Sequence, residues 1–390
     1  MRGLPFEYAV RNMTRNPVRL LLSAGGCGLV VLLVMAAGGF VSGMQRSLRT
    51  SGSPNNVMLV GAGSEESVER SEIPMRTTGI AASGIRGVDR IAGVDAVSPE
   101  VHVAIPVVSS GDAEADAINM IFRGVTPTAF LVHREARVTA GRFPATGGDE
   151  IAVGVLAARG LGWERVEDAI GGELVVDDRP FTIVGLLEAD GGVIEGEIWM
   201  PVSDLLIVAK RDTLSCVVVR LDSENITSAA GFAATRLDLE LAVIREDRYF
   251  AELSAFFEPV RLMVIATAVL VAAGGVVGGL NTTYAAFASR VREIGTLRTL
   301  GYSRLAIVRT LLEESVLMAA IGGLAATFIG RLIFDGMTIQ FSMGAFGLDV
   351  GPAEIALGLL AGLVLGVVGA LIPAYRCLRL PIPEALRSAA

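Results

Sequence analysis

Residue types that commonly carry catalysis are scarce in this 390-residue sequence, and their spacing argues against an enzyme. The only lysine, Lys210, follows "LLIVA" and not the glycine-rich loop that a phosphate-binding lysine needs. The two histidines, His102 and His133, form neither an HExxH motif nor a cluster with cysteine. We therefore predict no ATP site and no catalytic zinc site, and we interpret both histidines as ordinary surface or partly buried residues.

Two acidic residues in "GGVIEGEIWM", Glu195 and Glu197, have the spacing of a conceivable hydrolase pair. Residues two apart on a strand point to the same side, so we interpret the pair as part of a solvated face. The stretch "GAGSEE" from Gly61 lacks the third glycine of a dinucleotide loop, and no G-x-S-x-G motif is present. The sequence thus predicts no catalytic, cofactor-binding or metal-binding residue.

A short connector between two apolar segments, "SRVREIGTLRTLGYSRLAIVRTLLEES" at 289–315, contains five arginines and three acids. Its first apolar residues fall at helical spacing: Phe287, Val291, Ile294 and Leu297. Arg290 interrupts this apolar arc, Gly301 is a plausible helix terminator, and Ser303 is a plausible cap for the next helix. Either the arginines only anchor two membrane spans at the inner face, or the short helix is a surface on which a soluble subunit pushes.

Hydrophobic residues make up 52% of the sequence and are clustered, which is typical of a membrane protein. Three charge-free stretches, at 20–45, 262–289 and 355–375, each exceed the roughly 20 residues that cross a bilayer. A fourth stretch at 315–330 continues past Arg331, whose side chain could snorkel to the interface. The first stretch is longer than the core of a signal peptide, so we interpret it as a retained span.

The placement of arginine predicts the orientation of these four spans. Arginines lie in the N-terminal segment, the connector and the tail, whereas the short loop 335–351 has none. Cytoplasmic loops are enriched in arginine, so we expect both termini inside and the long insert outside the cytoplasm. That insert has 33 acidic against 19 basic residues, which argues against nucleic-acid binding. Of the three cysteines only Cys216 lies in it, so no disulfide forms within it.

The sequence therefore predicts an α-helical membrane protein with four transmembrane helices and a large mixed α/β extracytoplasmic domain between the first two. The predicted order is an amphipathic cytoplasmic-face segment (1–19), a first span (20–44), the extracytoplasmic domain (45–259), a second span (260–286), the connector (287–310), a third span (311–334), a short external loop (335–352), a fourth span (353–375) and a cytoplasmic tail (376–390). A helix that starts outside after Arg245 is expected to run into the second span, with Pro259 starting or kinking it.

Short apolar runs predict strands in the extracytoplasmic domain, among them 56–60 and 215–221, and 173–188 predicts two strands around a turn. Glycines at four-residue spacing predict close packing of the spans, or simply reflect the frequency of small residues in membrane helices. They are Gly274, Gly278, Gly275, Gly279, Gly358, Gly362 and Gly366. No charged residue lies deep in a predicted span, which argues against an ion-coupled secondary transporter.

Several motifs resemble one known family in the right order. "REIGTLRTLG" (292–301), "LLEES" (311–315) and "PAYRCLRLPIPEALR" (373–387) resemble the FtsX-like permease domain of MacB-type ABC transporters, as does "YAVRNMTRNPVRLLLSAGG" near the N-terminus. In the insert, "TAGRFPATGGDEIAVGVLAARGLG", "FTIVGLLE" and "EIWMPVSDL" resemble the MacB-like periplasmic core domain. "SGSPNNVMLV" and "FRGVTPTAF" are nearest to the DevC-like branch. The resemblance covers one four-span unit, so we expect ATP and Mg²⁺ to bind a separate ATPase.

The resemblance implies a permease subunit in the inner membrane, as a pair of chains, expected to be identical, on two ATPase subunits. It implies that the segment 290–301 is a coupling helix and that ATP-driven motion reaches the outer domain through the membrane helices. The implied ATPase contacts are Arg290, Arg292, Glu293, Gly295, Arg298 and Gly301, with 6–15 as a second contact. A membrane-fusion or adaptor protein is a further implied partner. An alternative is an FtsX-like regulator of a cell-wall hydrolase; a two-span receptor does not fit four spans.

Overall fold

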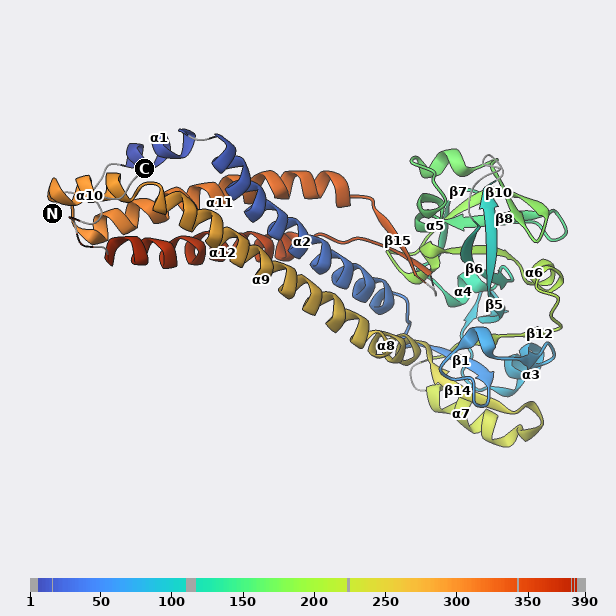
Figure 1. The fold of residues 1–390 in the computed structure, drawn as a ribbon. Helices are drawn as coiled ribbons and strands as arrows, with labels where there is room; N and C mark the ends of the chain where they lie inside the picture. Colours follow the sequence, from blue (N-terminus) through green and yellow to red (C-terminus); the bar gives the residue numbers. More distant parts are fainter. Residues whose placement is uncertain are drawn as a thin grey trace. The chain divides into compact units, whose positions relative to one another are not determined.

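The computed structural model describes residues 6–15, 17–109, 117–222, 225–341 and 344–379, with 381 and 383. Most of the predicted cytoplasmic tail lies outside these residues. The chain forms two compact units (Figure 1). We call Met1–Ser42, Pro259–Asp335 and Leu348–Ala390 the membrane unit, and Gly43–Glu258 with Gly336–Gly347 the outer unit.

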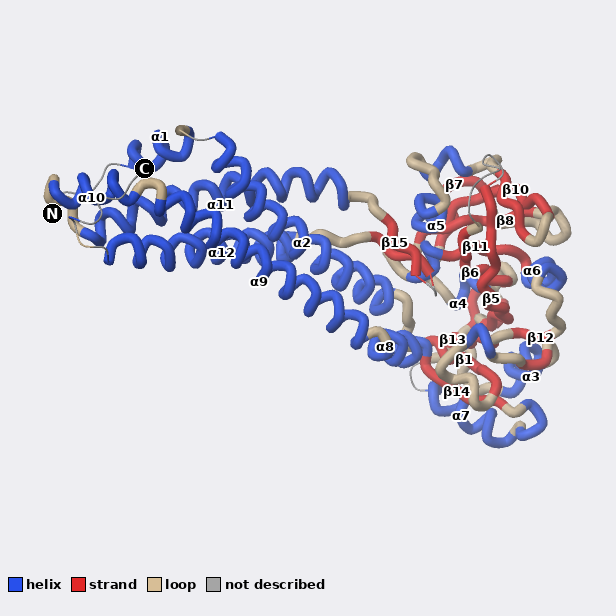
Figure 2. Tube along the Cα trace, viewed as in Figure 1, coloured by secondary structure: helices blue, strands red, loops and turns tan. Residues whose placement is uncertain are grey.

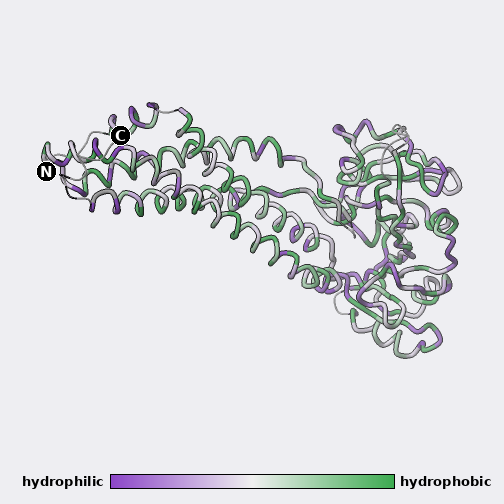
Figure 3. The backbone as a smooth tube through the Cα atoms, viewed as in Figure 1, coloured by the Kyte–Doolittle hydropathy of each residue, from purple (hydrophilic) through white to green (hydrophobic). Residues whose placement is uncertain are grey.

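Within the described residues, the membrane unit has four helices that are long and apolar enough to cross a membrane. They are α2 (Pro17–Thr50), α9 (Glu258–Ala288), α11 (Arg304–Phe334) and α12 (Pro352–Arg379). In Figure 1 they run alongside one another, and in Figure 3 hydrophobic residues recur along each of them. Two short helices complete this unit: α1 (Phe6–Thr14) and α10 (Val291–Thr299). The insert between the first two spans therefore forms most of the outer unit. The rest of that unit is a hairpin between α11 and α12.

A ten-stranded sheet organises the outer unit, with strand order β14-β1-β13-β5-β6-β11-β8-β10-β7 and with β9 beside β10 and β5 (Figure 2). The strands are β1 (Asn56–Gly61), β5 (Val97–Ser109), β6 (Ile118–Val125), β7 (Arg137–Gly141), β8 (Glu150–Gly154), β9 (Glu173–Val176), β10 (Arg179–Glu188), β11 (Glu197–Pro201), β13 (Cys216–Arg220) and β14 (Leu241–Arg245). Two small pairs lie outside it: β2 (Ile73–Pro74) with β12 (Thr213–Leu214), and β3 (Arg90–Ile91) with β4 (Val94–Asp95).

Helices cover this sheet. They are α3 (Thr77–Gly84), α4 (Ala129–Val132), α5 (Val155–Gly160), α6 (Val202–Val208), α7 (Ile226–Thr235) and α8 (Glu246–Phe256), with short 3-10 turns η1 (Val68–Arg70), η2 (Val166–Ala169), η3 (Val193–Gly196) and η5 (Leu237–Leu239). The largest fully buried side chains include Trp199 of β11, Phe122 of β6 and Phe181 of β10. This core fixes the sheet on which the polar groups described below are placed.

Strand β5 is shared by two halves of the sheet. Its residues 97–100 pair with β13, and its residues 101–107 pair with β6. Glu100 is therefore the last residue on the β13 side of this junction. The predicted hairpin at 173–188 is present as β9 and β10, and its turn residues Asp177 and Asp178 both have positive φ, as a two-residue type I′ turn requires.

The predicted continuous helix into the second span is interrupted. Helix α8 ends at Phe256, Phe257 forms a turn, and α9 begins at Glu258. Pro259 lies in the first turn of α9, where its missing amide hydrogen breaks no helical hydrogen bond. Pro259 therefore lies at the start of the second span.

The segment between α11 and α12, expected as a short loop, forms a hairpin of β15 (Thr338–Phe341) and β16 (Gly344–Gly347). It belongs to the outer unit, where Ala345 packs with Val155 and Leu156 of α5. The backbone of β16 also approaches η3 closely, because a Cβ on Gly196 would lie 2.4 Å from the amide nitrogen of Ala345. The outer unit thus contains, besides the long insert, the short segment that connects α11 to α12.

Replacing Gly196 with alanine is expected to displace this hairpin. The new Cβ would overlap backbone atoms of Ala345, so we expect a loss of about 1–3 kcal/mol in the free energy of unfolding. Thermal unfolding of the purified chain in detergent measures this effect. The matched control is Gly231→Ala in α7, where a Cβ meets no described atom within 4 Å. Equal stability of the two variants would show that the hairpin does not depend on this contact.

Candidate functional site at the connector helix

The connector forms a helix whose apolar side is buried against the ends of α11 and α12. Val291 and Ile294 of α10 pack with Phe287 and, from the two long helices, with Ile307, Leu311, Ala370 and Ala374. Gly301 after this helix has φ of +91°, and the Ser303 hydroxyl accepts a hydrogen bond from the Ala306 amide at 3.2 Å. The predicted helix, its terminator and the cap of the next helix are confirmed.

The structure divides the six predicted ATPase-contact residues into two groups. Arg292 and Gly301 are exposed, and Arg298 is half-buried. Gly295 is buried, and Arg290 and Glu293 turn toward other parts of the membrane unit. Arg292 therefore offers an exposed guanidinium near the turn at Gly301, whereas Arg298 lies four residues after the buried Ile294 and thus on the same side of α10.

Arg290 and Glu293 belong to a polar network that also includes Tyr8, Asn12 and Glu314. The Arg290 guanidinium donates to Glu293 Oε2 at 3.0 Å, to Glu314 Oε2 at 3.2 Å and to the Tyr8 hydroxyl at 3.3 Å. The Tyr8 hydroxyl donates to Glu293. The Asn12 amide donates to Glu314 Oε2 at 2.5 Å. These contacts join three helices, α1, α10 and α11.

Burial makes this polar network energetically important. The Glu314 side chain is 1% exposed, and a buried carboxylate is tolerated only when charged or polar groups compensate it. Burial would also raise the pKa of Glu293, but hydrogen bonds from Arg290 and Tyr8 outweigh this effect and lower that pKa below its ordinary value. The interruption of the apolar arc by Arg290 is thus explained, because its side chain compensates two carboxylates.

Sequence reasoning placed 6–15 at this site only as a second ATPase contact, and it missed that Tyr8, Asn12 and Glu314 belong to the polar network. Tyr8 and Asn12 are four residues apart and therefore lie on one face of α1, while the apolar Phe6 and Val10 are exposed. Glu314 lies within the quoted "LLEES" stretch. A buried acid in an otherwise apolar helix is a signal that could have been used.

The predicted packing glycines also fall into two groups. On α12, Gly358 and Gly362 face Val31 of α2, and Gly366 faces Ala319 of α11. On α9, a Cβ at Gly274 or Gly278 would meet no described atom within 4 Å. These two glycines line an apolar groove of about 480 Å³, and their packing role stays a prediction.

Replacing Gly366 with leucine is expected to separate α12 from α11. An added Cβ alone would lie 2.7 Å from the Cβ of Ala319, and the rest of the side chain needs more room. We expect a loss of about 1–3 kcal/mol in stability, measured as thermal unfolding in detergent. Gly369→Leu on the same helix is the control, because a Cβ there meets no described atom within 4 Å. Equal unfolding temperatures for the two variants would contradict the assignment.

Two expectations for the outer unit are wrong. His102 and His133 are both buried, as are Glu195 and Glu197, and Glu195 lies in η3 rather than on the strand with Glu197. The physical reason is that polar groups compensate these side chains: Arg123 pairs with Glu197, and the backbone amides of Ala189 and Gly191 donate to Glu195. A pattern of residues two apart contains no information about such partners.

Comparison with known proteins agrees with this architecture. Residues 20–237 match the MacB-like periplasmic core domain, and residues 265–382 match the FtsX-like permease C-terminal region. The macrolide export ATP-binding/permease protein MacB of Nitrobacter winogradskyi is 26% identical over 95% of this chain and 58% of its own length. The uncharacterized ABC transporter permease YknZ of Bacillus subtilis is 23% identical over 93% of this chain and 92% of its own length.

Among solved structures, the periplasmic region of MacB from Actinobacillus actinomycetemcomitans is similar to 54% of this chain, with 97% of that structure covered, 12% identity and a TM-score of 0.40. The chain spans a little over half of the Nitrobacter relative, whose name includes an ATP-binding function. The similarity therefore concerns part of that relative and almost the whole of the Bacillus permease.

Proposed function

This chain belongs to the family of the MacB-like periplasmic core domain, and we propose that it is the permease subunit of an ABC-type exporter or extractor driven by a separate ATPase. The observation that carries the proposal is the connector helix α10. Its apolar side and the polar network attach it to α1 and α11, while Arg292 is exposed and Arg298 is half-buried on the side of Ile294. Such a helix can receive a push from a soluble partner and pass it to the membrane helices.

The proposed partner surface on the ATPase is acidic, because Arg292 and Arg298 offer two guanidinium groups for charge-assisted hydrogen bonds. Gly301 beside them allows close approach, and Gly295 allows α10 to lie close to its own neighbours. Arg290 and Glu293 act in this proposal as positioning residues that keep α10 attached to α11 and α1. We place this face and both termini in the cytoplasm, as the arginine distribution indicates.

Motion of α10 reaches the outer unit mechanically in this proposal. Helix α11 leads along the chain to the hairpin of β15 and β16, and α2 and α9 continue into the outer unit at its two ends. The charge-free cores of the predicted spans favour this mechanism over a polar substrate channel. We propose a pair of such chains in the inner membrane, with an adaptor protein outside.

Co-purification of the tagged chain from its native membrane tests the proposal. We expect an ABC ATPase to be recovered, with ATP hydrolysis by the complex faster than by the ATPase alone. An adaptor protein in the same preparation would support export. Recovery of a cell-wall hydrolase instead of an adaptor would contradict export, and absence of any ATPase would contradict the permease assignment.

A further inference from the structure

Six titratable side chains are buried together where the two halves of the outer sheet meet, and we call them the buried charge cluster. They are Glu100, His102, Arg123, His133, Glu197 and Glu246. Glu100 and His102 come from β5, Arg123 from β6 and Glu197 from β11. His133 directly follows α4, and Glu246 is the first residue of α8. The cluster therefore joins strands from both halves to the helix that precedes the second span.

Contacts within this cluster form one continuous chain. Arg123 donates to both carboxylate oxygens of Glu197, at 2.7 and 2.6 Å, and to Glu100 Oε2 at 3.0 Å. His133 Nε2 lies 2.8 Å from Glu100 Oε1, and its Nδ1 lies 3.4 Å from Glu246 Oε1. The second oxygen of Glu246 accepts from the Asn56 side chain at 2.8 Å and from the Ser53 amide at 3.1 Å.

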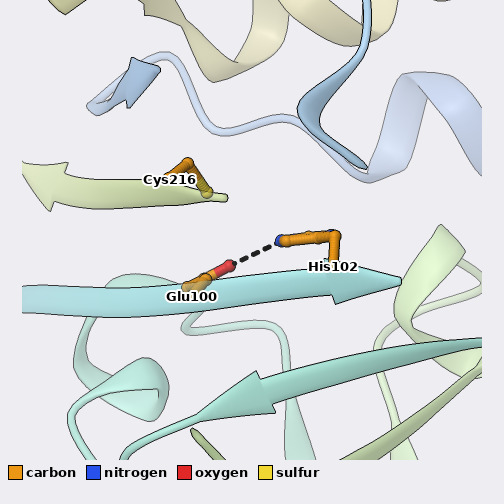
Figure 4. Close-up of side chains that lie close together, drawn as sticks. All are labelled: Glu100, His102 and Cys216. Atoms are coloured by element: carbon orange, nitrogen blue, oxygen red, sulfur yellow. Dashed lines mark hydrogen bonds and ion pairs between the residues drawn. The ribbon is translucent and has the colours of Figure 1, made fainter. Parts of the chain in front are cut away.

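Part of the cluster has the composition of a metal site. Glu100, His102 and Cys216 have ligand-type atoms within 4.8 Å of one another, and Figure 4 shows Cys216 on the strand beside Glu100. However, His133 and Arg123 already engage the two oxygens of Glu100. A guanidinium 3.0 Å from the carboxylate also places positive charge where a cation would bind. These residues therefore form an ion-pair cluster, not a metal site.

The position of His133 between two acids determines its charge. The groups that face it are Glu100 from β5, Glu246 from α8, Arg123 from β6 at 3.5 Å and Glu135 from its own loop at 3.9 Å. Burial and Arg123 lower the pKa of His133, but Glu100 and Glu246 outweigh them and raise it to about 9. His133 is therefore an imidazolium at neutral pH: its Nε2 donates a hydrogen bond to Glu100, and its Nδ1 faces Glu246 at ion-pair distance. Burial and Arg123 instead lower the pKa of His102, which is neutral.

We propose that His133 is a protonation-dependent clasp that fastens the first turn of α8 to the junction of the outer sheet. The charged ring bridges Glu100 in β5 and Glu246 in α8, and Glu246 in turn holds the Ser53 amide, three residues after α2 ends. The clasp thus ties together the two places where the outer unit continues into predicted spans. It is a property of the outer unit alone and does not depend on the proposed function.

The sign of the pH dependence follows from the raised pKa. A group whose pKa is higher in the folded than in the unfolded state stabilises the fold fully below its unfolded value, near 6.5 for histidine. This stabilisation is lost as the pH rises through about 9, where His133 loses its proton. Above that pH, Glu100 and Glu246 face a neutral ring, so the first turn of α8 is released.

Fluorescence of Trp199 provides a local test in the full-length chain. Its ring centroid lies 6.3 Å from that of His133, and its indole nitrogen donates to Glu197 at 3.0 Å. Replacing the other tryptophan, as Trp163→Phe, leaves one reporter. We expect emission to change between pH 7 and 10 with a midpoint near 9. His133→Gln should abolish this transition, whereas His102→Gln should retain it.

A second variant keeps the test informative if His133→Gln fails to fold. Glu246→Gln preserves the shape of the side chain but removes one of the two acids beside His133, so the midpoint should fall below that of the parent. Hydrogen exchange at pH 7 should also be faster in the first turn of α8 in His133→Gln, while β8 should be unaffected. An unchanged midpoint in Glu246→Gln, or a transition that persists in His133→Gln, would overturn the proposal.

Discussion

Replacing Arg290 with alanine is expected to destabilise the membrane unit by about 3 kcal/mol, because it leaves a buried carboxylate without its charged partner. Arg290 donates to Glu314 at 3.2 Å and to Glu293 at 3.0 Å, and the Glu314 side chain is almost completely buried. The attachment of α10 to α11 and α1 should loosen together with the fold. Thermal unfolding in detergent measures the first effect, and coupled ATP hydrolysis in the assembled complex measures the second.

The control for this prediction is an arginine in an ordinary surface pair. Arg309 donates to Glu313 at 2.8 Å on the same helix as Glu314, but its side chain is 81% exposed. An exposed pair contributes at most about 1 kcal/mol, so Arg309→Ala should be nearly neutral. Arg290→Lys should fall between the two, since it restores the charge without the planar set of donors. Equal stability of Arg290→Ala and Arg309→Ala would show that the polar network does not hold α10.

Reversing the charge of Arg292 and Arg298 together is expected to reduce stimulation of ATP hydrolysis by more than about tenfold, because like charges would then meet at the proposed interface. Arg292 is exposed and Arg298 is half-buried, so we expect the variant Arg292→Glu/Arg298→Glu to insert and fold, which its unfolding temperature in detergent checks. The measurement is the rate of ATP hydrolysis by the reconstituted complex relative to that of the ATPase alone.

A double reversal in the outer unit provides the matched control. Arg159→Glu/Arg165→Glu changes the net charge equally, and both of these arginines are exposed. The control should leave the stimulation unchanged. If the two double variants behave alike, the arginines of α10 only anchor the spans and do not contact an ATPase.

Local patterns predicted much of the connector correctly. Three features depend only on residues within one or two helical turns: the apolar arc from Phe287 to Leu297, the terminator at Gly301 and the cap at Ser303. Neighbouring residues are therefore sufficient to predict them. The four apolar helices and the hairpin turn at Asp177 and Asp178 are predictable for the same reason. The conflict between Arg290 and its apolar neighbours was visible in the sequence, although its cause was not.

Long-range pairs could not be predicted from local patterns. Tyr8 and Glu293 are 285 positions apart, and Asn12 and Glu314 are 302 positions apart. Likewise, Glu246 lies far along the chain from His133, so the sequence alone suggested an ordinary histidine. The hairpin between α11 and α12 depends on a surface on α5 and η3 that exists only after the outer unit has folded.

Site-specific crosslinking from α10 tests the central claim most directly. A photoreactive side chain would replace the exposed Arg292 in one variant and the exposed Arg159 of the outer unit in another, and each chain would be irradiated in its native membrane. We expect Arg292 to yield a covalent product with an ATP-hydrolysing subunit and Arg159 to yield none. Absence of that product from Arg292, in a preparation that still contains the ATPase, would contradict the assignment of α10 as the coupling helix.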